Sequence, residues 1–339
     1  MVQLPPVIAG TSSLGNLYTA LPPEKKKQIV AAYLETAGRP AVFDCAGKYG
    51  AGLALEALGR CLKELGVPPE EVMISNKLGW VRTPLESAEP VFEPGIWKDL
   101  RHDARQQIGY DEIMECFEQG NELLGDYNAG MVSIHDPDEY LFAAGSEEDA
   151  EVRYTNILDG YRALTDLKQQ GLVDSIGIGS KDWKTIQRIS GDIMLDWVMF
   201  ANSLTIYSHP TALMNFVNEL SANGVTVINS AVFHGGFLTG GDYFNYRRVS
   251  RDIEAHRDLF VWRDRFYTIC REFGINPASA AIRFALDIPG VHSIALSSSS
   301  PARTRENLLM TDAVIPQEFW QEMKVRGLLS ENVSNSIDQ

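Results

Sequence analysis

Cysteine is scarce in this chain, and positive charge is in deficit. Its 339 residues include four cysteines, and no two of them form a Cys-x-x-Cys pair. The wide scatter of Cys45, Cys61, Cys116 and Cys270 argues against a disulfide framework or a zinc site. Lys and Arg number 30 against 45 Asp and Glu, which gives a formal net charge of −15. Such an acidic surface argues against nucleic acid or an anionic membrane as the main partner.

Long hydrophobic runs are also missing. No segment approaches the roughly 20 apolar residues that a membrane-spanning helix needs. The opening Met-Val-Gln-Leu-Pro-Pro does not place a charged region before a long apolar stretch, as a secretory signal would. We therefore expect a protein of the reducing cytoplasm. Nothing in the pattern distinguishes a monomer from a dimer.

The apolar residues that are present, 45% of the chain, recur in short blocks. Eight of these blocks are apolar on both faces and precede a helical pattern, which is typical of strands covered by crossover helices. Eight β-then-α units predict an α/β fold, a (β/α)8 TIM barrel, as a single domain over residues 1–339. The expected strands are Val7–Gly10, Ala41–Cys45, Val72–Asn76, Met131–His135, Ser175–Gly179, Trp197–Ala201, Val225–Asn229 and Ser293–Leu296.

A doubly wound open sheet is the structural alternative. It would be expected to open its first helix with Gly-x-Gly-x-x-Gly, which is absent there, and Gly177-Ile178-Gly179 lacks the third glycine. Three connections, 80–109, 136–150 and 235–258, are too long for plain turns. In a barrel all three follow strands and lie on the catalytic face, where long loops shape a substrate pocket.

Ionisable side chains stand at the ends of three successive expected strands. Asp44 and Tyr49 belong to the second strand and its turn, Lys77 follows the third, and His135 ends the fourth. Each alone has a plain explanation: a helix cap, a packing tyrosine, a solvent-facing lysine and a hydrogen-bonded core histidine. Parallel strands end at one edge, so the four groups are expected to converge.

The chemistry of such a set is coherent. A phenol with a pKa near ~10 is a poor acid at neutral pH, and a neighbouring ammonium such as that of Lys77 is expected to lower this pKa. Asp44 would orient Lys77, and His135 would steer a carbonyl or hydroxyl oxygen of the substrate. The pattern predicts general acid–base catalysis combined with a hydride carrier.

With these residues the chain resembles the aldo-keto reductase superfamily, and the resemblance extends over nearly its whole length. The resemblance implies that Tyr49 transfers the proton, that Lys77 and Asp44 tune it, and that His135 orients the substrate. It is closest to the sugar 1-dehydrogenase branch, which includes the D-threo-aldose, L-fucose and L-galactose dehydrogenases, with pyridoxal dehydrogenase as a relative. The segments that carry it are Phe43-Asp44, Tyr49-Gly50, Asn76-Lys77-Leu78-Gly79, Ile134-His135-Asp136-Pro137-Asp138 and Gly15-Asn16-Leu17-Tyr18.

The resemblance also implies NAD or NADP as the cofactor, without a metal. The serine-rich run 297–300 opens a helix after the last strand, and hydroxyls with a helix N-terminus suit an anion, although a plain serine-rich loop is the alternative. Ser298 is expected at the phosphate, Arg303 at the adenine or ribose phosphate, and Glu306 and Asn307 at the adenine edge. Ser297 stands where many members carry a lysine for the 2′-phosphate, so we expect NAD to be usable.

The nicotinamide end departs from the family pattern. Ser180 is followed by an unusual Lys181, and the contact from the sixth strand is either Asn202 or Ser203. Ser230 stands where many members carry a stacking tyrosine, so Phe233 is expected to contribute there.

Two further readings concern the substrate side. Trp80 and Trp97 are expected to line the sugar pocket together with His135, although rim packing explains Trp80 equally well. A metal at His135, Asp136 and Asp138 is disfavoured because no second ligand cluster is evident.

These expectations define one leading function and two alternatives. The leading function is an NAD(P)-dependent oxidoreductase that oxidises the C1 hydroxyl of an L-fucose- or D-threo-aldose-type sugar to a lactone. The alternatives are a broad-specificity aldehyde or ketone reductase and a cofactor-binding regulatory subunit. The complete set of four residues argues against the regulatory subunit. The expected partner is a small sugar or carbonyl compound.

Overall fold

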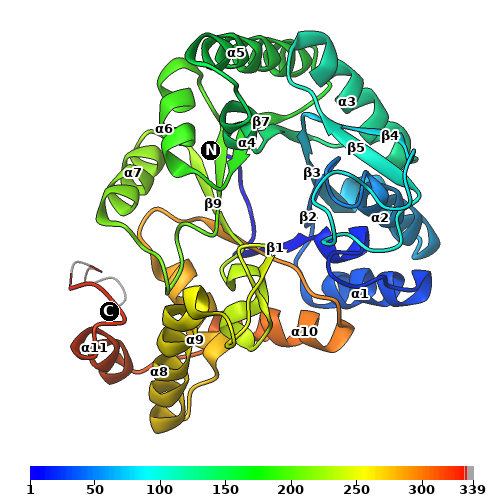
Figure 1. The fold of residues 1–339 in the computed structure, drawn as a ribbon. Helices are drawn as coiled ribbons and strands as arrows, with labels where there is room; N and C mark the ends of the chain where they lie inside the picture. The colour runs from blue at the N-terminus through cyan, green and yellow to red at the C-terminus, as the bar shows by residue number, and fades with distance from the viewer. Residues whose placement is uncertain (332, 334–339) are drawn as a thin grey trace.

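Eight parallel strands close into a barrel at the centre of the computed structural model, which describes residues 1–331 and 333 (Figure 1). The predicted (β/α)8 barrel is confirmed, and every expected strand matches an observed one to within two residues at either end. In the order of hydrogen-bonded neighbours the strands are β1 (Val7–Gly10), β12 (Ser293–Leu296), β9 (Thr226–Ser230), β8 (Trp197–Ala201), β7 (Ser175–Ser180), β6 (Met131–His135), β3 (Val72–Leu78) and β2 (Ala41–Ala46).

Helices surround the barrel and cover the outer faces of the strands (Figure 1). Helix α2 shows the reason, because its leucines at 55, 58 and 62 are fully buried while Glu56 and Arg60 face water. Helix α8 ends at Gly274, whose positive φ of 67° terminates the helix before the next segment. The longer helices are α1 (Pro23–Thr36), α2 (Leu53–Glu64), α3 (Tyr110–Leu124), α5 (Glu147–Gln169), α6 (Trp183–Asp192), α7 (Thr211–Ala222), α8 (Arg257–Phe273), α9 (Pro277–Asp287), α10 (Pro301–Leu309) and α11 (Gln317–Val325).

The two-residue period of the strands sets which side chains enter the barrel. Val42 of β2 packs inside with Met131 of β6 and Ile228 of β9. Since alternate residues share a face, Asp44 on β2 and His135 on β6 point inward as well, nearer the carboxyl ends. Parallel pairing sets the strands side by side, with Ala46 opposite Lys77 and His135 opposite Gly179. The apolar layer therefore fills the floor of the barrel, and the ionisable layer forms its top.

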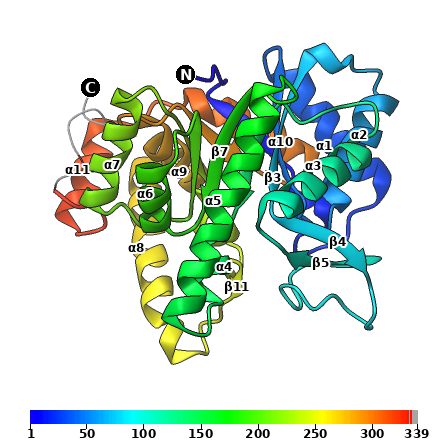
Figure 2. The same ribbon diagram turned by 90° about the horizontal axis from the view of Figure 1, so that it is seen from above.

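The three long connections gather at this same end. Figure 2 shows β4 (Trp80–Pro84), β5 (His102–Gln106), α4 (Pro137–Phe142) and β11 (Arg247–Arg248) at the end of the barrel opposite the N-terminus. Strands β4 and β5 form an antiparallel hairpin, as do β10 (Tyr243–Phe244) and β11. The three connections were expected to be long loops on this face, and the structure shows short strands and a short helix within them. Short 3-10 helices span Ser12–Gly15, Pro69–Glu71, His234–Thr239, Glu254–His256 and Met310–Asp312.

Two further observations concern the cysteines and the hydropathy of the helices. All four cysteines are buried and free. In the part of the chain that the structure describes, no helix is both long and apolar enough to cross a membrane.

Candidate active site

A buried ion pair between Asp44 and Lys77 forms the base of the site. The Lys77 Nζ donates to both carboxylate oxygens of Asp44, at 2.6 and 2.7 Å, and to the backbone oxygen of Cys45 at 3.1 Å. These three bonds use all three donors of the ammonium. Gly179 on β7 makes room for the lysine, because a Cβ atom there would lie 2.7 Å from the Lys77 Cδ.

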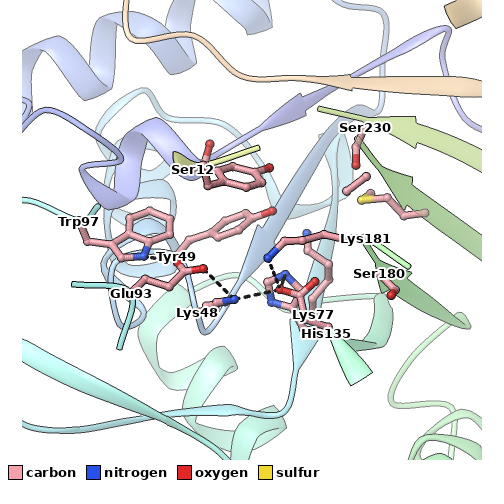
Figure 3. Close-up of a pocket in the computed structure, with 15 residues that line it drawn as sticks. Ser12, Lys48, Tyr49, Lys77, Glu93, Trp97, His135, Ser180, Lys181 and Ser230 are labelled. Carbon is pink, nitrogen blue, oxygen red and sulfur yellow. Dashed lines mark hydrogen bonds and ion pairs between the residues drawn. The ribbon is translucent and has the colours of Figure 1, made fainter. Parts of the chain in front are cut away.

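Tyr49 lies on the turn that follows β2, directly above this pair. Its position depends on close backbone contacts: a Cβ at Gly15 would lie 2.7 Å from the Tyr49 carbonyl group. The Lys77 Nζ lies 4.8 Å from the centre of the Tyr49 ring. The ring of His135 meets the Tyr49 ring edge-on, with centroids 5.6 Å apart. The structure thus brings the four predicted catalytic candidates to one place, as Figure 3 shows for Tyr49, Lys77 and His135.

The pKa of Tyr49 lies well above its usual value, chiefly because the ring is buried and secondly because the Asp44 carboxylate is near. The prediction that Lys77 would lower this pKa is wrong for the free protein. The positive charge of Lys77 is already matched by Asp44, so little of its field remains to stabilise a phenolate. Burial also holds the pKa of His135 well below its usual value, although Asp136 acts in the opposite direction. Tyr49 is therefore a neutral phenol and His135 a neutral imidazole near pH 7.

Beside these residues lies a charge network that the sequence did not predict. Lys48, the residue before Tyr49, contacts carboxylate oxygens of Glu93, Asp136 and Glu139 at 3.0, 2.9 and 2.7 Å. Lys181, which follows Ser180, pairs with Asp136 at 3.3 Å and with Glu139. Figure 3 shows Lys48 and Lys181 converging on the side of His135. We call Lys48, Glu93, Asp136, Glu139 and Lys181 the charge network.

Trp97 connects the charge network to the pocket lined by Tyr49, Lys77 and His135, which we call the inner pocket. The indole Nε1 of Trp97 donates to Glu93 at 2.7 Å, and its ring lies 5.9 Å from that of Tyr49. Trp97 and Tyr246 line the inner pocket together with Tyr49, Lys77 and His135. Trp80, the other tryptophan expected there, instead packs behind the pocket against Phe92, with 9% of its surface exposed. Its ring lies 4.7 Å from the Lys48 Nζ, so Trp80 takes the rim-packing alternative.

An outer cavity of about 460 Å³ continues from the inner pocket towards α10. Its walls hold the predicted cofactor residues Phe233, Ser298, Arg303, Glu306 and Asn307. The hydroxyl of Ser300 caps α10 by accepting from the Arg303 backbone N–H at 3.5 Å. Within the loop, Ser297 accepts a hydrogen bond from the Ser12 hydroxyl at 3.1 Å, which links the two sides of the cavity.

The residues predicted to contact the nicotinamide do not all line the inner pocket. Ser230 and Ser180 line the inner pocket. The Ser180 hydroxyl donates to Asp138 at 2.6 Å, and burial raises the pKa of that carboxyl to about 6. Asn202 is buried next to Ser230, with its side-chain oxygen unpaired among the described residues, and it is not one of the residues that line the inner pocket or the outer cavity.

The donor set and the cavity suit a nicotinamide dinucleotide. The hydroxyls of Ser180 and Ser230 line the inner pocket and can hydrogen-bond a carboxamide, and the outer cavity is within the usual range of about 300–1,000 Å³ for ligand sites. A helix N-terminus with adjacent hydroxyls faces the same cavity, which suits a phosphate. In the described residues no group of three His, Cys, Asp or Glu side chains is arranged to hold a metal ion.

Comparison with known proteins identifies the family. The model of the Aldo/keto reductase family matches residues 6–325. Pyridoxal 4-dehydrogenase of Microbacterium luteolum is 27% identical over 337 residues, covering 95% of this chain and 93% of its own. D-threo-aldose 1-dehydrogenase of a Pseudomonas species is 25% identical over 334 residues, covering 97% and 95%. D-threo-aldose 1-dehydrogenase belongs to the branch that the motifs indicated, and pyridoxal dehydrogenase was named there as a relative of that branch.

Solved structures agree on the fold. A glycerol dehydrogenase from Gluconobacter oxydans superposes with a TM-score of 0.68 at 18% identity, covering 98% of this chain and 93% of its own. The holo form of an aldo-keto reductase from Bacillus halodurans gives 0.67 at 18% identity, covering 98% and 95%. The family match, the barrel and the cavities together show that this chain belongs to the aldo/keto reductase family and is an NAD(P)-dependent oxidoreductase.

Proposed function

We propose that the protein oxidises the C1 hydroxyl of an aldose of the L-fucose or D-threo-aldose type to a lactone, with Tyr49 as the acid–base residue. The observation that carries this proposal is the meeting of Tyr49, Lys77 and His135 in one pocket that opens into the outer cavity. The match to a D-threo-aldose 1-dehydrogenase supports the choice of substrate class.

In this proposal each side chain has one task. When bound, the oxidised nicotinamide supplies the hydride acceptor and a positive charge on its ring. Because Tyr49 is a neutral phenol in the free protein, oxidation would require it first to release its phenolic proton to solvent, a loss that the positive nicotinamide ring would favour. The Tyr49 phenolate would then take the proton of the C1 hydroxyl as C1 loses its hydride, and the C1–O bond becomes the lactone carbonyl. His135, being neutral, hydrogen-bonds the substrate oxygen without adding charge. In the reverse direction Tyr49 gives its proton to the carbonyl oxygen.

The supporting residues hold this geometry. Asp44 fixes the Lys77 ammonium below the Tyr49 ring through two charge-assisted bonds. Ser180, Asn202, Ser230 and Phe233 would hold the nicotinamide half of the cofactor. Arg303, Glu306 and Asn307 of α10 would hold the adenosine half.

The test follows nicotinamide absorbance with purified protein, NAD and NADP in parallel, and a panel of neutral aldoses. The panel also includes simple aldehydes and pyridoxal, because one relative is named a pyridoxal dehydrogenase. Turnover of L-fucose-, L-galactose- or D-arabinose-type sugars is expected. Activity on aldehydes alone would move the function to a general carbonyl reductase, and tight cofactor binding without any turnover would favour a regulatory role.

A further inference from the structure

A two-residue turn carries Tyr246 to the catalytic pocket. Strands β10 and β11 pair Phe244 with Arg247, so Asn245 and Tyr246 form the turn between them. Both turn residues have a left-handed backbone, with φ of 49° and 65°. Two-residue turns of this kind favour Asn followed by Gly, and a larger residue in the second position is strained. The tyrosine is therefore held in this turn by contacts that offset the strain.

The buried imidazole of His234, which follows β9, holds the turn in place. Because the Asn245 Oδ1 can only accept, the Nδ1 of His234 donates to it, at 2.6 Å, and the Nε2 accepts from the Thr205 hydroxyl, also at 2.6 Å. Burial lowers the pKa of His234 to about 4, so the ring is neutral near pH 7, as this pair of bonds requires. The ring also stacks on Phe244, with centroids 4.7 Å apart. One buried side chain thus fixes the turn by a hydrogen bond and by a ring contact.

The turn places Tyr246 where the two cavities meet. Among the described residues, those that line both the inner pocket and the outer cavity are Ser12, Tyr49, Ser230 and Tyr246. The phenol of Tyr246 lies near enough to Tyr49 to raise the pKa of Tyr49 when it ionises. Burial raises the pKa of Tyr246 itself to about 12, so its hydroxyl stays protonated near pH 7. A second neutral phenol therefore stands beside the proposed acid–base residue.

The hydroxyl of Tyr246 is free to bind a ligand. The Ser12 hydroxyl donates to Ser297 at 3.1 Å, and the Ser230 hydroxyl donates to the backbone oxygen of Phe200 at 2.9 Å. Within the described part of the chain the Tyr246 hydroxyl has no hydrogen-bond partner. Of the hydroxyls at this junction, Tyr246 thus supplies the uncommitted donor besides Tyr49.

We propose that Tyr246 binds the substrate hydroxyl on the carbon next to the reacting carbon, and that His234 is the positioning residue of Tyr246. Tyr49 and His135 share the reacting oxygen, and the neighbouring hydroxyl of a sugar lies one carbon away from it. The site therefore prefers substrates with a hydroxyl at that carbon, as aldoses have at C2, because a donor that meets no partner discriminates against the deoxy analogue. The inference rests on the proposed function, whose substrate class it narrows.

The first experiment compares D-arabinose with 2-deoxy-D-ribose, which differ only in the hydroxyl at C2. Tyr246→Phe is expected to lower the ratio of kcat/KM for D-arabinose over the deoxy sugar by about 3–10-fold. Comparing this ratio between two proteins cancels the different intrinsic reactivity of the two sugars. Tyr110→Phe makes the same chemical change between α3 and α5, where the hydroxyl donates to Asp166 at 2.7 Å, and is the matched control with an unchanged ratio.

The second experiment tests the positioning role of His234. His234→Ala is expected to lower the same ratio, and Asn245→Gly removes the bond to His234 in case loss of the buried ring unfolds the chain. Glycine adopts the left-handed backbone freely, so Asn245→Gly leaves the turn unstrained. Neither change is expected to lower the ratio further when Tyr246→Phe is already present, because both act through Tyr246. A merely structural role would lower kcat/KM for both sugars equally and leave the ratio unchanged.

The outcomes separate this inference from the proposed function. An unchanged ratio in Tyr246→Phe overturns the role of Tyr246 and leaves the sugar dehydrogenase standing, and a fall there without one in Asn245→Gly overturns the role of His234. Turnover of aldehydes alone overturns the proposed function, and glycolaldehyde against propionaldehyde then replaces the sugar pair.

If nothing is turned over, fluorescence titration of the cofactor-bound protein with the two sugars decides, because Trp97 lines the pocket. A preference for D-arabinose that Tyr246→Phe reduces supports the inference. Equal preference in both proteins, or no binding of either sugar, overturns it.

Discussion

Gly179→Ala tests whether the position of Lys77 matters for catalysis. The new Cβ would lie 2.7 Å from the Lys77 Cδ, whereas carbon atoms in contact prefer about 3.5–4.0 Å. The lysine stem must therefore move by about 1 Å. Its ammonium is held at 2.6 and 2.7 Å by Asp44 and at 3.1 Å by Cys45, so the head cannot follow without losing a bond.

The expected size follows from these contacts. Loss of one charge-assisted hydrogen bond costs about 1.5–3 kcal/mol of unfolding free energy. A displacement of about 1 Å in a catalytic constellation lowers kcat by roughly 100-fold. The unfolding free energy is measured by urea unfolding, and kcat is measured by steady-state turnover of the best sugar. Gly191→Ala in α6 is the matched control, because a Cβ there meets no atom within 4 Å and needs no unusual backbone angle. If Gly179→Ala behaves like this control in both assays, the account of how Lys77 is positioned is refuted.

Two further predictions concern the neighbouring carboxylate and the cofactor cavity. Asp138→Asn is expected to raise the unfolding free energy at pH 8 by about 1–3 kcal/mol, because the folded pKa of Asp138 is raised to about 6 and its ionised form is disfavoured in the folded state. The gain should vanish by about pH 4, where the native carboxyl is protonated, and a pH-independent difference in urea unfolding would contradict it. Arg303→Ala is expected to raise the cofactor KM by roughly 10–100-fold with little change in kcat, and more strongly for NADP than for NAD. An unchanged KM for both cofactors in initial-rate assays would place Arg303 outside the binding site.

The barrel was predictable because its strands are short, apolar on both faces and separated by helical patterns. The convergence of Asp44, Tyr49, Lys77 and His135 followed from the rule that parallel strands end together. The β4–β5 hairpin was not predictable, because β5 is mostly polar, neither segment alternates apolar and polar residues, and β4 ends in Pro84. Its pairing depends on contacts with the barrel top that no local pattern encodes.

The charge network escaped prediction for a related reason. Lys48 and Asp136 are 88 residues apart in sequence and meet only because the barrel closes. Two signals were present: Lys48 stands directly before Tyr49, and Lys181 is unusual for the family at its position. The direction of the Tyr49 pKa shift was also missed, since Lys77 was treated as a free charge when Asp44 already balances it.

The most direct test of the central claim is the turnover of Tyr49→Phe beside its affinity for the cofactor. The substitution removes only the phenolic oxygen, so cofactor binding measured by fluorescence should remain within about twofold of the native protein. Turnover on the best substrate is expected to fall by roughly 10²–10⁴-fold, the usual contribution of a positioned acid–base group. A variant that keeps more than about a tenth of native turnover would contradict the assignment of Tyr49 as the proton-transfer residue.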